Sequence, residues 1–220
     1  MMGVWQSLIS GALAKIGTVG EGNYFEIEPD GTWVNNGDST TWDEISQPLF
    51  AARLDTSSGR IDYNYDELTV DFADNARYPE EPANVVIQAP HAWKIGSDLR
   101  PHIHWIQTSD AMPNILVAYR FYSNGELVPS SFTLKALTAS DSAFTYTSGS
   151  LQQITNLNLP TGLFTDETIS FTFDCKIYRD TGNVSNLFSG ADSYSGVWSV
   201  KYYDIHFERD MNGSREEFTK

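Results

Sequence analysis

Residues 169–178 read ISFTFDCKIY, and this stretch decides the fold class. Apolar side chains stand at every second position from Ile169 to Ile177. The positions between them carry polar side chains, namely Ser170, Thr172, Asp174 and Lys176. Strict alternation with a period of two is typical of an antiparallel strand that buries one face and exposes the other. We therefore predict a half-buried strand here.

The same kind of pattern extends over most of the chain. Residues 197–209, VWSVKYYDIHFER, predict a second long strand whose apolar face becomes clear toward its end. Short runs rich in β-branched and aromatic residues, separated by turn residues, occur at 24–28, 32–34, 61–65, 68–72, 85–89, 102–108, 115–122, 132–137 and 144–147. Many short strands with regular turns predict an all-β, antiparallel two-sheet β-sandwich, most simply a jelly roll.

The N-terminal segment reads differently. Residues Gly3 to Ile16 predict a short amphipathic helix, and the glycine-rich segment 17–23 predicts a hinge after it. We therefore divide the chain into a helical arm with its hinge at residues 1–22 and a single β-sandwich domain at 23–220. A further helical turn is predicted up to Ile45, capped by Ser39 or Thr40. The residues of the arm expected to pack on a neighbouring subunit are Val4, Trp5, Leu8, Ala12 and Ile16.

Composition limits the partners. The 220 residues include 14 Lys and Arg against 29 Asp and Glu, a net charge of −15. A strongly acidic surface argues against nucleic acid and against anionic membranes as partners. No apolar stretch approaches the roughly 18 residues that a membrane span needs. The single cysteine, Cys175, excludes an intramolecular disulfide and is expected to be a buried thiol.

The histidines are the main candidates for a site. His102 and His104 alternate on a predicted strand, so both imidazoles point to one face about 7 Å apart. With a third ligand they would suit zinc, iron or nickel, as in cupin-like proteins on a jelly roll. His206 lies between Asp204 and Glu208 on one face of another strand, a group that would suit a cation or an acid–base pair. The alternative is that these side chains bond to backbone, carboxylates or water on a polar sheet face.

Catalytic signatures are weak. The sequence has no Gly-x-Ser-x-Gly elbow, and carboxylate pairs cannot be nominated among 29 acidic residues. We therefore expect no enzyme activity, no catalytic residues and no cofactor. The chain has six Trp and eleven Tyr, and exposed ones would stack on sugars, so a carbohydrate-binding β-sandwich for host attachment is the alternative function.

Three blocks of the sequence together resemble a known group of proteins. They are GDSTTWDEI at residues 37–45, QAPHAWKIGSDLRPHIHW at 88–105, and a third that runs from CKIYRD at 175–180 through YDIHFERD at 203–210 to GSREEFTK at 213–220. In this order and spacing they resemble a family of poorly characterised structural proteins of tailed bacteriophages and prophages.

The resemblance implies a β-sandwich protein of the virion, most simply a capsid decoration or a head–tail-associated component. Its partners would be other virion proteins and further copies of itself, with a trimer favoured. The resemblance implies no catalytic residues.

Overall fold

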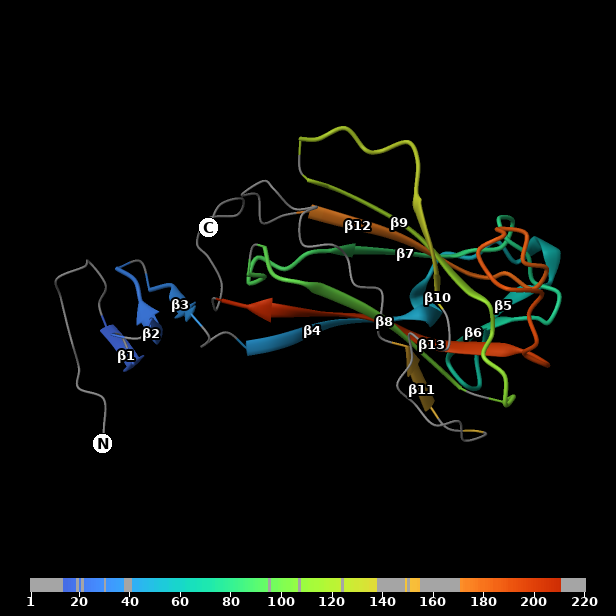
Figure 1. Cartoon of the computed structure of the whole chain (residues 1–220), viewed down its shortest axis with the longest axis horizontal. Coiled ribbons are helices and arrows are strands. Elements are labelled where there is room, and N and C mark those ends of the chain that lie inside the picture. Colours follow the sequence, from blue (N-terminus) through green and yellow to red (C-terminus); the bar gives the residue numbers. More distant parts are fainter. Residues whose placement is uncertain are drawn as a thin grey trace.

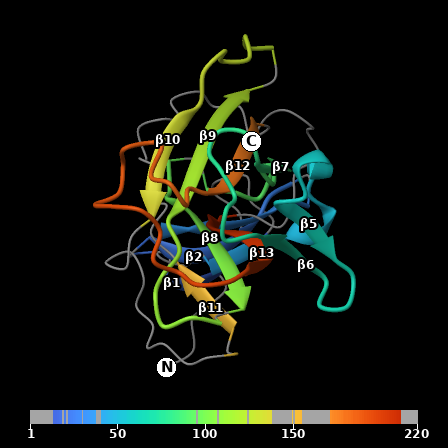
Figure 2. The same cartoon turned by 90° about the vertical axis from the view of Figure 1, so that its right-hand side faces the viewer.

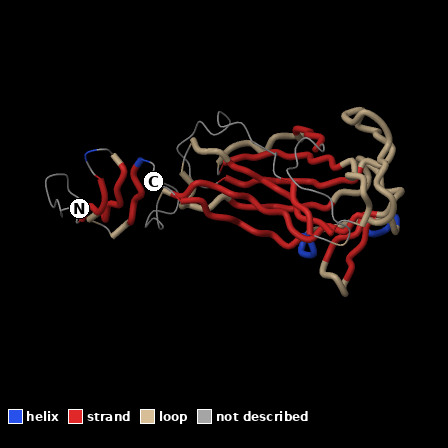
Figure 3. The backbone as a smooth tube through the Cα atoms, turned by 60° about the horizontal axis from the view of Figure 1, so that its bottom comes forward, coloured by secondary structure: helices blue, strands red, loops and turns tan. Residues whose placement is uncertain are grey.

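The computed structural model describes residues 14–18, 20, 22–29, 31–37, 41–94, 96–106, 108–123, 125–137, 149, 151–154 and 171–210. Strands make up most of this part of the chain (Figure 3). The two 3₁₀ helices with assigned bounds are η3 (Leu49–Ala51) and η4 (Thr56–Ser58). No helix within the described residues is long and apolar enough to cross a membrane. The strands are β1 (Ala14–Thr18), β2 (Asn23–Ile27), β3 (Trp33–Asn36), β4 (Thr41–Pro48), β5 (Ile61–Asn64), β6 (Thr69–Phe72), β7 (Ala83–Gln88), β8 (Leu99–Ile106), β9 (Ile115–Ser123), β10 (Thr133–Leu137), β11 (Leu151–Ile154), β12 (Phe171–Arg179) and β13 (Trp198–Arg209).

Two antiparallel sheets form the body of the molecule (Figures 1 and 2). One has the order β10-β9-β12-β7, and the other has the order β11-β8-β13-β6-β5, with β4 also paired to β13. Strands that follow one another in the chain often lie in different sheets, as in β7 then β8 and β12 then β13. This strand order resembles that of a jelly roll, in which two Greek keys fold over one another. The predicted antiparallel β-sandwich is therefore confirmed.

The core lies between these two sheets. Phe171, Phe173, Cys175 and Ile177 of β12 are all buried, as the alternating pattern predicts. The Phe173 ring stacks on that of Tyr203 in the opposite sheet, with ring centroids 6.2 Å apart. Aromatic side chains bury large apolar areas and contribute strongly to the stability of such cores. The core also contains three fully buried tryptophans, namely Trp93, Trp105 and Trp198.

Two local predictions are wrong. The helical turn expected to end at Ile45 is instead part of strand β4, which pairs with β13 from Thr41 to Pro48. The N-terminal helix fails over its last residues, because Ala14 to Ile16 begin strand β1. The other arm residues, Val4, Trp5, Leu8 and Ala12, lie outside the described residues.

Strands β1, β2 and β3 form a separate three-stranded sheet at one end of the sandwich (Figure 1). β1 and β2 pair along their whole length, from Ala14 opposite Ile27 to Thr18 opposite Asn23. Gly17, Thr18 and Asn23, at the two ends of the predicted hinge, therefore belong to paired strands. The strands predicted at 24–28 and 32–34 correspond to β2 and β3, which pair as an antiparallel hairpin. The division of the chain at residue 22 stays a prediction.

Gly17 shows why this hairpin needs a glycine. Its φ angle is +129°, which side-chain-bearing residues rarely adopt. A Cβ atom there would lie 2.8 Å from the Asn23 carbonyl oxygen and 2.9 Å from the Tyr24 Cα. The absence of a side chain at position 17 therefore allows β1 to lie close to β2.

One end of β13 meets this small sheet. The Asn35 backbone N–H donates to the Asp210 carbonyl oxygen, and its side-chain amide donates to the Arg209 carbonyl oxygen at 3.3 Å. Asn35 is itself buried. The sheet is thus anchored to the strand that runs through the middle of the larger sheet of the sandwich.

Candidate functional site

Three neighbouring strands bring histidines and carboxylates together on the outer face of the larger sheet. β13 lies between β8 and β4, and all three run antiparallel to their neighbours. The register places His102 of β8 opposite Asp204 of β13, and His206 of β13 opposite Glu44 of β4. Positions that lie opposite each other across an antiparallel pair point to the same face.

The alternation of the strands fixes which face this is. Ile103 and Trp105 of β8, and Ile205 of β13, are buried in the core between the sheets. Their chain neighbours His102, His104 and Asp204 therefore project from the opposite surface of the sheet. The prediction that His102 and His104 share one face is confirmed, because their rings lie edge to face with centroids 4.9 Å apart.

The inner part of the cluster is buried. The Oδ2 atom of Asp204 lies 2.9 Å from Nε2 of His104 and 3.5 Å from Nε2 of His102. The side chains of His102 and Asp204 are only 2% and 4% exposed, and that of His104 is 17% exposed. A buried carboxylate with two imidazoles on one oxygen is a costly arrangement unless protons or a cation neutralise it.

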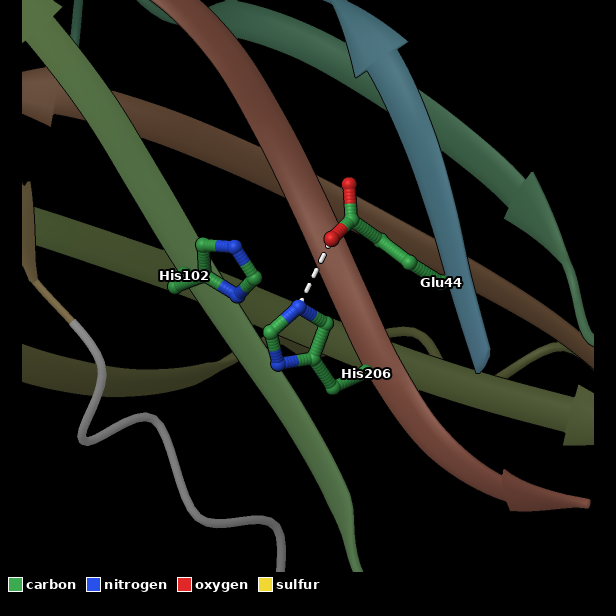
Figure 4. A group of neighbouring side chains, drawn as sticks. All are labelled: Glu44, His102 and His206. Atoms are coloured by element: carbon green, nitrogen blue, oxygen red, sulfur yellow. Dashed lines mark hydrogen bonds and ion pairs between the residues drawn. The ribbon is translucent and has the colours of Figure 1, made fainter. Parts of the chain in front are cut away.

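The outer part is more exposed. Nε2 of His206 lies 2.7 Å from Oε2 of Glu44, and both side chains are about two-fifths exposed. Figure 4 shows this pair beside His102, whose ring centroid lies 4.4 Å from that of His206. His102 therefore belongs to both parts of the cluster.

The electrostatics favour an ionised Asp204. Burial alone would raise the pKa of this carboxyl, but its contacts with His102, His104 and Ser46 outweigh burial and lower the pKa well below the ordinary 3.8. Hydrogen bonds to the charged form of a carboxylate have this effect in general. A negative charge is therefore held in a nearly solvent-free position next to two imidazoles.

The donor atoms match the chemistry of a transition-metal site. His102, His104 and Asp204 each offer one ligand atom within 4.8 Å of the others, and so do Glu44, His102 and His206. Two imidazoles and one carboxylate are a common set for zinc and for iron(II). The sequence pattern indicates His102, His104 and the shared face of Asp204 and His206 as candidates. It misses Glu44, because the pattern at residues 39–45 predicts a helical turn there.

Other residues singled out from the sequence take no part in the cluster. The Glu208 side chain pairs with Lys94 at 3.2 Å. The fourth histidine of the chain, His91, belongs to neither of the two groups of ligand atoms found among the described residues. Cys175 is buried, and burial raises the pKa of its thiol to about 12, so it is not poised as a nucleophile.

Comparisons with known proteins give the following results. No protein-family model matches the chain, and no curated protein matches it. Among solved structures, a "xylan-binding module CBM15" aligns with a TM-score of 0.40 and 12% identity, covering 77% of this chain and 99% of the module. The VP2 subviral particle of infectious bursal disease virus aligns with a TM-score of 0.35 and 14% identity, covering 85% of this chain and 39% of the viral one. The Gx strain of that virus aligns with a TM-score of 0.34 and 14% identity, covering 86% and 39%. These are distant similarities between β-sandwich folds.

Proposed function

We propose that this chain is a non-enzymatic structural protein of a phage virion, a capsid decoration or head–tail-associated component that works by assembly of subunits. The observation that carries the proposal is the small sheet of β1, β2 and β3, which projects from one end of the sandwich (Figure 1). We thus assign the assembly role, which the sequence pattern predicts for an N-terminal helix, to this β-sheet. The resemblance of the three sequence blocks supports the setting in a virion.

One face of this sheet is apolar. The register places Ile16 opposite Phe25, and Ile27 opposite Trp33, so these four side chains share a face. Ile16, Phe25 and Trp33 are respectively 54%, 38% and 49% exposed. The opposite face carries Lys15 and Glu26, whose ion pair spans 3.3 Å. A small sheet with an exposed apolar face is marginal by itself and gains stability when that face is covered.

The charge of the chain restricts where a second copy can bind. Two copies that each carry −15 repel one another over most of their surfaces. On the apolar face, however, none of the positions in the β1–β2–β3 register carries a charged side chain. Copies can therefore meet there without placing like charges together. We infer a homo-oligomer, with a trimer favoured, that uses this face.

Sedimentation equilibrium tests this assembly. We expect the full-length chain to be oligomeric and the Phe25→Ser/Trp33→Ser variant to be monomeric. A Tyr24→Ser variant, on the opposite face of the same sheet, is the matched control and should stay oligomeric. A monomeric wild-type chain, or equal loss in the control, would contradict the proposed interface. Absence of the chain from purified phage particles by mass spectrometry would contradict the role in a virion.

A second function is favoured by one aromatic cluster. The rings of Phe50, Tyr63 and Tyr65 lie together, with centroids 5.4 Å apart for Phe50 and Tyr63 and 5.3 Å apart for Phe50 and Tyr65. Tyr65 is 73% exposed, which is unusual for an aromatic side chain in a packed cluster. Such a ring would stack on a sugar of a host glycan. A glycan array, repeated in calcium, tests this: binding should be lost in Tyr65→Ala, and an array without hits would refute it.

A further inference from the structure

We propose that His102, His104 and Asp204 bind one divalent transition-metal ion, with Zn²⁺ as the probe, and that this ion ties β8 to β13. The site lies apart from the proposed assembly face, because its residues belong to the sandwich and the assembly face belongs to β1, β2 and β3. Three observations carry the proposal.

The first observation is the spacing of the ligand atoms. Two ligands at about 2.0–2.1 Å from a tetrahedral zinc lie about 3.3 Å from one another. The Oδ2 atom of Asp204 lies 3.5 Å from Nε2 of His102 and 2.9 Å from Nε2 of His104. These two distances bracket the expected one, and the ligand atoms of His102 and His104 lie within 4.8 Å of each other. Side-chain movements would therefore bring all three atoms around one ion.

The second observation concerns the protons of His102. Its Nδ1 lies 3.4 Å from the Arg100 carbonyl oxygen, and its Nε2 lies 3.5 Å from Oδ2 of Asp204. Both oxygens only accept hydrogen bonds, while a neutral imidazole carries a single N–H. If Nε2 donates to Asp204, then Nδ1 has no proton left for the carbonyl oxygen. A metal ion between Nε2 and Oδ2 would take the place of that proton and leave the N–H on Nδ1, whose hydrogen bond to the Arg100 carbonyl is the usual support for a ligating histidine.

The third observation is the second carboxylate oxygen of Asp204. The Oδ1 atom is buried, and among the described residues no hydrogen bond within ordinary distance and angle limits ends on it, although Ser46 lies close enough to the carboxylate to help lower its pKa. Buried polar atoms without a partner are rare in folded proteins and point to a water or an ion nearby. An ion bound to this carboxylate would lower the cost of burying it.

The outer pair is assigned a different role. His206 and Glu44 already contact each other at 2.7 Å and are much more exposed than the inner three residues. We place the ion at the inner group, because burial excludes competing water and strengthens each metal–ligand bond. His206 and Glu44 are then the more exposed neighbours of the site, beside His102 (Figure 4).

Metal analysis of untagged, chelator-treated, full-length protein tests the site. After zinc is added back and free zinc is removed, we expect one Zn²⁺ per chain by elemental mass spectrometry. We expect at least a tenfold loss of affinity in Asp204→Asn and in His104→Gln. His91→Gln and His206→Gln are matched histidine controls and should keep wild-type affinity. A Zn²⁺ concentration 100 times Kd should raise the melting temperature of the wild type by about 5–10 °C.

Each outcome decides the proposal. Circular dichroism checks that Asp204→Asn and His104→Gln are folded, and both replacements are close in size to the original side chain. Substoichiometric zinc in the wild type, or equal zinc binding in the wild type and Asp204→Asn, would refute the site. A loss in His206→Gln as large as that in Asp204→Asn would also overturn it, because the ion would then belong to the outer group.

Discussion

Replacement of Arg179 provides the sharpest test of how the sandwich is held together. This arginine ends β12, and its side chain is 1% exposed. Its Nε donates to Oδ2 of Asp192 at 2.7 Å, and the Asp192 side chain is equally buried. The remaining guanidinium nitrogens donate to the carbonyl oxygens of Phe72 at 3.1 Å, Gly196 at 2.6 Å and Tyr194 at 2.5 Å. One side chain thus joins β12, the end of β6 and the long loop before β13.

The Arg179→Met variant removes all four hydrogen bonds and leaves Asp192 as a buried charge without its partner. Breaking a buried ion pair from one side costs about 3–5 kcal/mol. For a chain of this size that loss corresponds to a fall in melting temperature of about 6–20 °C. Urea denaturation followed by tryptophan fluorescence measures the free energy of unfolding directly, since several tryptophans are buried in the core.

Two further variants separate the ion pair from the packing. Arg209→Met is the matched control, because Arg209 also contacts an aspartate, Asp43, at 3.0 Å, but both side chains are at least one-third exposed. An exposed pair contributes about 1 kcal/mol or less. Arg179→Met/Asp192→Asn should recover part of the loss, because no buried charge is left unpaired. If Arg179→Met costs no more than Arg209→Met, the reasoning about the buried network is wrong.

Three other expectations follow from single groups. Cys175 should not react with a thiol reagent at pH 8 in the native protein, because burial raises the pKa of its thiol to about 12, and it should react fully in denaturant. A fast reaction of the native protein would contradict this. Asp204 has a lowered pKa, so it stabilises the fold above its ordinary pKa of 3.8 and loses that effect as the pH falls below it. The difference in unfolding free energy between the wild type and Asp204→Asn should therefore shrink on acidification below about pH 4, and a constant difference would argue against it. Gly17→Ala should speed hydrogen exchange of β1 amides, because of the close approach to β2, while exchange in β12 serves as the unchanged control.

The sandwich could be predicted because apolar and polar residues alternate within the sequence of individual strands. The alternation around Phe173 and Cys175 is local information, and the burial of these residues follows from it. The failures occur where local signals conflict. Ala14 and Ile16 fit a helix face as well as a strand face, and the pairing with β2 decides between them. Ser39 and Thr40 are good cap residues, but pairing with β13 overrides the preference of the segment that follows them.

The candidate site could be predicted only in part, for a related reason. The spacing of His102 and His104 is visible along one strand, and so is that of Asp204 and His206 along another. Which strands become neighbours, and in which register, depends on pairings across about 100 residues of chain for His102 with Asp204. Glu44 enters the cluster through a pairing of β4 with β13 that spans a still longer separation. No local pattern carries that information.

The same strand links the two proposals. β13 presents Asp204 to the histidines of β8, and five residues later the Arg209 carbonyl oxygen holds Asn35 of the projecting sheet. At about 3.4 Å per residue, the two points are about 17 Å apart along one strand. An ion that joins Asp204 to His102 would restrain β13 against β8, and it would also steady the end of β13 to which the assembly sheet is anchored. We therefore expect that removal of the metal with a chelator weakens the oligomer, a result that needs both the metal site and the assembly face. The Phe25→Ser/Trp33→Ser variant should still bind zinc as a monomer.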